Sequence, residues 1–235
     1  MILSQFKKEN PSCKVRNVFI YTELPEQLQT SLLNKGFDDV IFTLRLMRAF
    51  GVKPYEAMLM NTNLDIDIKG IPFFKSVHQY FKGYLKLKFS TYHKNLNYCP
   101  IYDNSQIKLF YTVKYYCYKN GDSLFSQYCT KNNITPNHKA FLNYIKRFYK
   151  VCSEFELHEE GRWGNPNQYR YDYLYFLFKA CMDEFNDVDK TVSYIANEKK
   201  WSEKNVYDKF KNKGFYEYYS LIKEKDAEYE YQLCS

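Results

Sequence analysis

The chain has 235 residues, with 34 Lys and Arg against 27 Asp and Glu, which gives a formal charge of +7. Hydrophobic residues make up 45% and charged residues 26%, a balance that excludes intrinsic disorder, collagen-like repeats and small disulfide-stabilised scaffolds. At roughly 100–200 residues per domain, this length predicts one large domain or two small ones. Because the sequence has neither an internal repeat nor a low-complexity linker, we expect one.

The residue types set further limits on the class of protein. With 25 Tyr and 19 Phe but only 8 Gly and 7 Pro, the composition favours long helices packed by aromatic rings. The 7 cysteines are an odd number without a Cys-x-x-Cys pair, so we expect reduced thiols in the cytoplasm or nucleus, and no metal or other cofactor. The first twenty residues do not resemble a signal peptide, and no apolar run is long enough to cross a bilayer, so no membrane association is expected.

The first third of the chain predicts helices. Residues 21–61 contain two helical patterns, the first beginning with a capping Thr22 and ending at Gly36, and the second ending at Gly51. A short third helix is predicted with Pro54 in its first turn, where the missing amide hydrogen costs nothing.

The middle of the chain changes to a period of two, which is typical of strands. Residues 64–74 alternate apolar and polar side chains and predict a short strand or a strand pair. A second alternating segment, residues 84–89, is followed by the polar stretch 90–95 and by residues 96–102. This order predicts a β-hairpin with a basic turn.

The rest of the chain returns to helical patterns, which predict helices over residues 105–121, 135–152, 168–185, 187–199 and 202–214. The expected fold class is therefore α+β: a mostly α-helical single domain with a small antiparallel sheet and β-hairpin near its middle.

The order of these elements resembles the catalytic domain of the tyrosine recombinase (phage integrase) family. The helix that ends at Gly51 is followed by the turn Val-Lys-Pro-Tyr-Glu and a strand, similar to the family's first catalytic arginine and the strand after it. The resemblance implies that Lys53 stands in the place of that arginine. It also implies that Lys94, with Lys88 as an alternative, is the hairpin lysine that protonates the leaving 5′ oxygen.

A second motif, Asn-Pro-Asn-Gln-Tyr-Arg at the start of the helix from residue 168, resembles the family's His-x-x-Arg. The resemblance implies that Arg170 is the second catalytic arginine and that Asn167 replaces the histidine. An arginine donates two parallel hydrogen bonds to the non-bridging oxygens of a phosphodiester, whereas Lys53 supplies charge without that fork.

The third motif, residues 191–210, resembles the family segment that ends with the nucleophile. The resemblance implies that Tyr207 attacks the phosphodiester and that Asn197 or Glu198 occupies the place of the family's histidine or tryptophan. Because tyrosine has an ordinary pKa near 10, Tyr207 would need cations nearby to form its phenolate. Asparagine can donate hydrogen bonds there but cannot shuttle protons.

The resemblance implies a recombinase-like domain over residues 22–214, with an N-terminal extension (residues 1–21) and a charged C-terminal tail (residues 215–235). Its expected partner is double-stranded DNA, with self-association on that DNA. Apart from the catalytic positions, we expect DNA contacts from five basic residues: Lys88, His93, Arg162, Lys199 and Lys200.

The sequence leaves the activity open between three functions. The first is a DNA strand-exchange enzyme that forms a 3′-phosphotyrosine. The second is a DNA-binding protein of the same fold whose active site has decayed, as Lys53, Asn167 and Asn197 suggest. The third is a helical protein–protein interaction module, in which Tyr207 and Arg170 only pack against other side chains. A helix-turn-helix over residues 191–210 is a weaker fourth interpretation.

Overall fold

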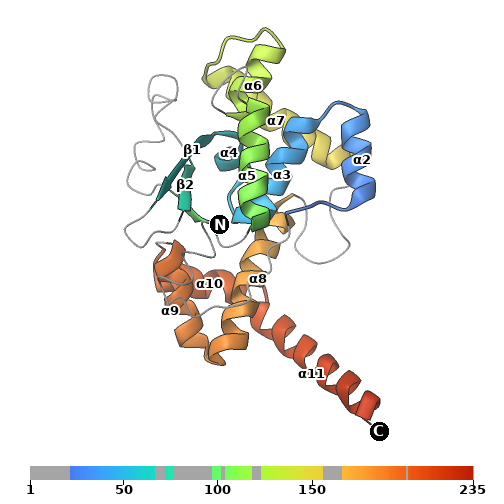
Figure 1. Cartoon of the computed structure of the whole chain (residues 1–235), viewed down its shortest axis with the longest axis vertical. Coiled ribbons are helices and arrows are strands. Elements are labelled where there is room, and N and C mark those ends of the chain that lie inside the picture. The colour runs from blue at the N-terminus through green and yellow to red at the C-terminus, as the bar shows by residue number, and fades with distance from the viewer. Residues whose placement is uncertain are drawn as a thin grey trace.

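The computed structural model describes residues 22–66, 72–76, 97–101, 104–117, 123–155, 166–199 and 201–234 (Figure 1). The expected N-terminal extension, most of the expected hairpin and the loop with Arg162 lie outside these residues.

The helices, in chain order, are α2 (Glu26–Asn34), α3 (Asp38–Phe50), α4 (Pro54–Met58), α5 (Asn104–Cys117), α6 (Leu124–Lys131), α7 (His138–Glu154), α8 (Asn167–Phe185), α9 (Val188–Lys199), α10 (Glu203–Asn212) and α11 (Phe215–Cys234). The strands are β1 (Met60–Ile66), β2 (Pro72–Ser76) and β3 (Asn97–Pro100).

The α+β class expected from the sequence is wrong, because the chain is mostly helical. Helices make up 81% of the part of the structure whose side chains are described, and no whole strand falls within that part. The backbones of the three strands pair antiparallel in the order β1-β2-β3. The expected hairpin is corrected as well, since β3 pairs with β2 and residues 84–89 lie outside the described residues.

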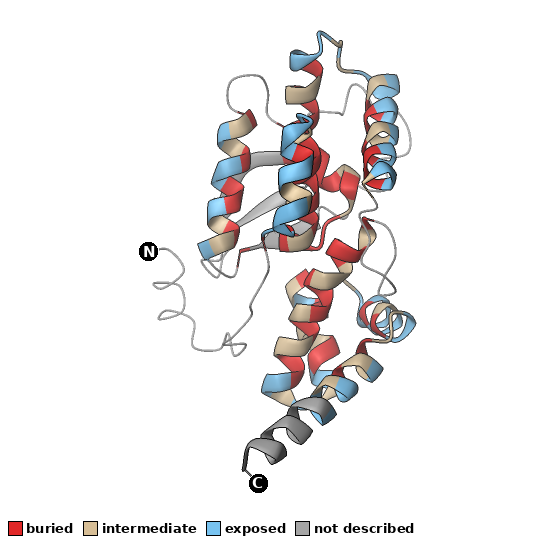
Figure 2. Ribbon diagram, turned by 90° about the vertical axis from the view of Figure 1, so that its right-hand side faces the viewer, coloured by how far each residue is buried: buried red, intermediate tan, exposed pale blue. Residues whose placement is uncertain are grey.

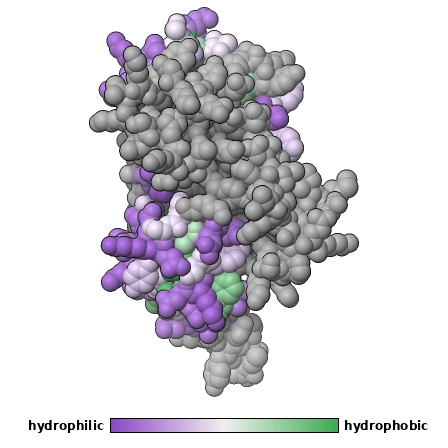
Figure 3. Space-filling view, turned by 90° about the vertical axis from the view of Figure 1, so that its left-hand side faces the viewer, coloured by the Kyte–Doolittle hydropathy of each residue, from purple (hydrophilic) through white to green (hydrophobic). Residues whose placement is uncertain are grey.

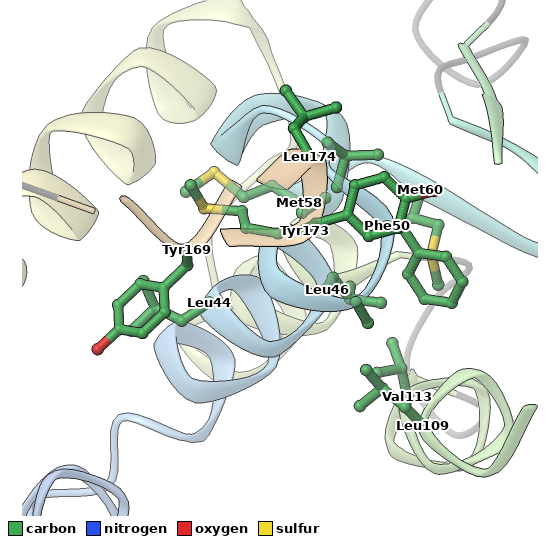
Figure 4. Packing of buried hydrophobic residues seen from close by; sticks show 14 of the residues in the cluster. Leu44, Leu46, Phe50, Met58, Met60, Leu109, Val113, Tyr169, Tyr173 and Leu174 are labelled. Atoms are coloured by element: carbon green, nitrogen blue, oxygen red, sulfur yellow. The ribbon is translucent and has the colours of Figure 1, made fainter. Parts of the chain in front are cut away.

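Helix α3 is the central element of the core. Its apolar residues recur at helical spacing, and nine of its positions are buried: Asp39, Val40, Ile41, Thr43, Leu44, Leu46, Met47, Ala49 and Phe50. Leu46 points toward Leu109 and Val113 of α5, whereas Leu44 points toward Tyr169 of α8 (Figure 4). Other helices are buried along the faces that they turn inward (Figure 2). Helix α3, in contrast, is buried on most of its circumference, as is typical of a helix at the centre of a domain.

An ion pair ties α3 to α7. Arg147 donates to both carboxylate oxygens of Asp39, over 2.7 and 3.3 Å, and its guanidinium carbon lies 5.1 Å from the ring centroids of both Phe37 and Tyr128. Asp39 is buried while Arg147 remains partly exposed. The forked geometry makes this one of the stronger kinds of ion pair.

Helix α8 connects the two ends of the molecule. Its first turns pack against α3, and its later turns contact α9 and α11. Phe178 on α8 lies 5.0 Å from Phe210 on α10 and 5.8 Å from Phe215 on α11, measured between ring centroids. The expected charged tail therefore begins as a packed helix, with Phe215 and Tyr219 buried, and α11 then projects away from the body (Figure 1).

No helix among the described residues is both long enough and apolar enough to span a membrane.

Candidate functional site

The candidate site is built on the turn that ends α3. Gly51 adopts a left-handed conformation with φ of +66°, and a Cβ at this position would lie 2.4 Å from Cδ1 of Tyr173. Glycine is therefore required at this position both by the backbone conformation and by the close approach of α8. This approach brings the first turns of α8 against the end of α3.

Two cations cap the carbonyl groups of this turn. Nε of Arg170 donates to the carbonyl oxygen of Gly51 over 2.9 Å, and Nζ of Lys199 donates to that of Phe50 over 3.2 Å. The last carbonyls of a helix have no partner within the helix and carry the negative end of its dipole. Arg170 and Lys199, only 8% and 4% exposed, thus stabilise the end of α3.

Lys53 begins the next helix beside this turn. Its backbone amide donates to Oε2 of Glu56 over 2.7 Å, and Pro54 follows in the first turn of α4. The buried Glu56 carboxylate thereby fixes the backbone at Lys53. The Lys53 ammonium lies 5.6 Å from the ring centroid of Tyr55.

Lys209 approaches the same place from α10. Its Nζ donates to Oδ1 of Asn205 over 2.5 Å and lies 4.6 Å from the ring centroid of Trp201. Partial burial, together with the nearby charges of Arg170 and Lys53, lowers the pKa of Lys209 to about 8, while Glu56 acts in the opposite direction. Charges that shift a pKa in this way must lie close to it.

We call Lys53, Arg170 and Lys209 the cation cluster. Among the described residues, none of the three has a carboxylate within ion-pair distance, and Nη1 and Nη2 of Arg170 have no hydrogen-bond partner. Nζ of Lys213, the residue that follows α10, lies 4.2 Å from the ring centroid of Tyr171. The described surface on the side of α9 and α10 is mainly hydrophilic, with apolar side chains between (Figure 3). The cluster can therefore attract an anion.

Tyr207, the expected nucleophile, lies on a different flank of α10. Val206 and Phe210 face the core, and at about 3.6 residues per turn Tyr207 and Lys209 fall on opposite sides of them. The Tyr207 ring is 43% exposed, and its centroid lies 6.2 Å from that of Tyr216 on α11. The structure thus places Arg170 against the turn that precedes Lys53 but turns Tyr207 toward α11.

The remaining expected residues are distributed as follows. Asn167 is the first residue of α8, one turn before Arg170 and half-buried, and Asn197 is exposed on α9. Lys199, expected to contact DNA, is buried at the end of α3. Five expected residues lie outside the described residues: Lys88, His93, Lys94, Arg162 and Lys200.

Sequence reasoning missed Lys209. It is one of six lysines between residues 199 and 213. The helical period indicates which face of α10 is buried but not which flank meets α8. Only the tertiary structure, in which the charges of Arg170 and Lys53 act on Lys209, distinguishes it from its neighbours.

Among the described residues there is no group of three or more His, Cys, Asp or Glu side chains that could hold a metal ion. No family model, curated protein or solved structure matches this chain.

Proposed function

We propose that the protein binds double-stranded DNA and that the cation cluster holds the phosphodiester backbone. The observation that carries this proposal is that Arg170 donates to the carbonyl of Gly51, two positions before Lys53, and that the charges of both residues act on Lys209 of α10. Like charges repel, so this arrangement costs free energy in the unbound protein and is relieved when an anion enters.

The donor set suits a phosphate group. Because Gly51 accepts from Nε of Arg170, the plane of the guanidinium is held in place, and its two Nη atoms can donate in parallel to two non-bridging oxygens. The ammonium groups of Lys53 and Lys209 supply compact charges beside that fork. A preorganised set of donors binds an anion with little loss of side-chain entropy.

Two further features support DNA as the source of the phosphate. The chain carries a formal charge of +7, which favours association with a polyanion. In addition, Lys53 and Arg170 are the two positions that the sequence resemblance to tyrosine recombinases aligns with the catalytic arginines, and they act on the same Lys209 ammonium. The resemblance and the geometry thus support the same ligand.

The arrangement favours binding over strand cleavage. A nucleophile must lie within hydrogen-bonding reach of the phosphate that it attacks, and Tyr207 faces α11 rather than Lys209. Lys53 also lacks the fork of an arginine. We therefore propose the DNA-binding form of the recombinase-like interpretation, without cleavage.

The proposal is tested by fluorescence anisotropy of a labelled duplex over a series of salt concentrations. We expect Lys53→Gln and Lys209→Gln each to weaken binding and to reduce the slope of log K against log salt by about 1, because each variant loses one phosphate contact. Lys204→Gln is the matched control, since Lys204 is exposed on the same helix, and its slope should match the wild type.

Two outcomes would overturn the proposal. One is the absence of duplex binding at moderate salt by the folded wild-type protein, which would favour the helical interaction module instead. The other is an equal loss of affinity in Lys204→Gln and Lys209→Gln, which would mean that the cluster is no better a contact than any surface lysine.

A further inference from the structure

Helices α9 and α10 are joined by a short turn, and the structure fixes both helix ends beside it. Only three residues, 200–202, separate the last residue of α9 from the first residue of α10. The amide of Trp201 donates to the carbonyl oxygen of Ala196 over 2.9 Å at the end of α9. Oγ of Ser202 accepts from the amide of Asn205 over 3.3 Å at the start of α10. A turn of this length is typical of a helix-turn-helix.

The two helices also pack as one unit (Figure 1). Their inward residues are apolar and buried: Val192, Ile195 and Ala196 on α9, and Val206 and Phe210 on α10. Oγ of Ser193 donates to Oε1 of Glu203 over 2.5 Å, which ties α9 to the first turn of α10. Phe210 also packs on Phe178 of α8, with ring centroids 5.0 Å apart. Contacts with two helices therefore hold α10 in a fixed direction.

The side of α10 that faces away from this packing is exposed and polar. At about 3.6 residues per turn, Lys204, Asp208 and Lys211 lie opposite the buried residues of α10, and all three are exposed. Every exposed residue of α10, a helix that the structure describes in full, is polar or aromatic. Residues 199–213 contain six lysines against two acidic residues, so this surface complements a polyanion better than an apolar partner helix.

The cation cluster borders this exposed face. Lys209 is the member of the cluster that α10 supplies. Its Nζ donates to Oδ1 of Asn205 over 2.5 Å and lies 4.6 Å from the ring centroid of Trp201 in the turn. A phosphodiester held by the cluster therefore lies along one flank of α10. Phosphate contacts of this kind fix the register and orientation of a protein on a duplex, while base contacts supply the sequence preference.

We propose that α9 and α10 form a helix-turn-helix and that α10 enters the major groove of the bound duplex, where its exposed face reads the base sequence. This inference rests on the proposed function, because the cation cluster supplies the phosphate contacts that position the helix. With ten residues, α10 is about 15 Å long, and the major groove, about 12 Å wide, admits an α-helix. Lys204 and Lys211 can donate to N7 and O6 of guanine, and Asp208 can accept from the amino group of cytosine.

The test is selection from a pool of duplexes with a random central segment, followed by anisotropy titrations at constant salt. We expect the wild type to enrich one sequence and to bind it at least about tenfold more tightly than a shuffled duplex of the same composition. Methylation of guanine N7 with dimethyl sulfate should block binding of the selected duplex, because N7 lies in the major groove.

Variants of the exposed face should change sequence preference more than general affinity. Lys211→Gln should bind the selected duplex at least about fivefold more weakly, the loss of one base contact, and bind the shuffled duplex with little change. Asp208→Asn should change the preferred base at one position. Lys204→Gln should lose preference as well, yet keep the salt slope of the wild type on the shuffled duplex, because a base contact is not a phosphate contact.

Lys146→Gln is the matched control, since Lys146 is an exposed lysine on α7, and it should leave both affinities unchanged. Thermal unfolding of each variant shows that it is folded. If the wild type binds duplexes but enriches no sequence, the helix-turn-helix proposal is wrong and DNA binding stands. If Lys211→Gln and Asp208→Asn both keep the preference of the wild type, α10 does not read the bases. If the wild type binds no duplex at moderate salt, both proposals fall.

Discussion

The Nε atom of Arg170 donates to the carbonyl oxygen of Gly51 over 2.9 Å, across 119 positions of the chain. This bond closes the end of α3, fixes the first turns of α8 against it and orients the guanidinium beside Lys53 and Lys209. The same contact therefore stabilises the fold and shapes the candidate site. Changes at this turn should affect both.

Gly51→Ala should be strongly destabilising. A non-glycine residue in the left-handed region costs about 1–2 kcal/mol. The added Cβ would also lie 2.4 Å from the Tyr173 ring, and such overpacking costs about 1–3 kcal/mol more. We expect the free energy of unfolding, measured by urea denaturation, to fall by about 2–5 kcal/mol.

Gly36→Ala is the matched control for this effect. Gly36 has a φ of +72°, but nothing lies within 4 Å of a Cβ placed there. Its substitution should therefore cost only the backbone part, about 1–2 kcal/mol. Equal losses at Gly36 and Gly51 would mean that the contact with Tyr173 contributes nothing.

Arg170→Lys should reduce DNA binding more than stability. A lysine can still donate to the Gly51 carbonyl, but it cannot at the same time offer two parallel donors to a phosphate. We expect duplex affinity to fall by about tenfold, the equivalent of roughly 1.4 kcal/mol, while the unfolding midpoint changes little. An unfolding midpoint that falls sharply with unchanged affinity would assign Arg170 to the fold alone.

Asp39→Asn should destabilise the contact between α3 and α7. The substitution leaves Arg147 without its buried carboxylate partner, and removing one member of a buried pair costs about 3–5 kcal/mol. Because Arg147 is 26% exposed and can keep some water, we expect the lower end, about 3 kcal/mol. A double-mutant cycle with Arg147→Met measures the coupling directly.

Lys150→Gln provides the comparison on α7. Lys150 and Glu154 are 3.7 Å apart and well exposed, and exposed pairs contribute about 0–1 kcal/mol. A coupling between Asp39 and Arg147 no larger than that of this exposed pair would contradict the importance of the buried one.

Duplex affinity should decrease as the pH rises through about 8, the pKa of Lys209. A phosphate favours the ammonium form, so a molecule that has lost this proton must take it up again on binding. The decrease should be smaller in Lys209→Gln. Anisotropy titrations from pH 6.5 to 9.5 at constant salt measure the difference, and identical profiles of the two proteins would contradict it.

The lowered pKa of Lys209 also predicts that the free energy of unfolding rises with pH, whereas duplex affinity falls. Between pH 8 and 10.5 the unfolded chain keeps the Lys209 proton while the folded chain releases it, so the unfolded state binds more protons and the free energy of unfolding rises with pH. Below pH 8 Lys209 is protonated in both the folded and the unfolded state, so the folded state carries the full repulsion of Lys209 by Arg170 and Lys53. Urea denaturation of the wild type relative to Lys209→Gln should show this rise.

The buried thiols should be unreactive in the native protein. Cys117, Cys129, Cys152 and Cys181 are buried, and burial raises the pKa of Cys129 to about 11 and that of Cys152 to about 12. In a variant with Cys13, Cys99 and Cys234 replaced by serine, a disulfide reagent at pH 8 should react only after unfolding, because the thiolate is the reactive form. Rapid release of its chromophore under native conditions would contradict this packing.

Much of the helical structure could be predicted from local patterns. The helix predicted to end at Gly51 is α3, the short helix at Pro54 is α4, and the patterns over residues 168–185 and 187–199 correspond to α8 and α9. Helical spacing, a helix-ending glycine and a proline in the first turn act over a few residues, so they are readable without the fold.

Other elements could not be predicted in this way. Helix α6 was missed because it has only eight residues, although Ser123 caps it by accepting from the amide of Ser126 over 3.2 Å. The α+β class was wrong because helices dominate the described residues, although β1 and β2 overlap the alternating residues 64–74. Short apolar patterns are ambiguous until long-range packing decides between them.

The sequence by itself determined most of the helical segments and the glycine at the end of α3. Only the tertiary structure decided that the charges of Lys53 and Arg170 act on Lys209 and that Tyr207 faces α11. The physical reason is that helical periodicity defines a buried face, whereas the neighbour that each flank meets depends on how distant helices pack.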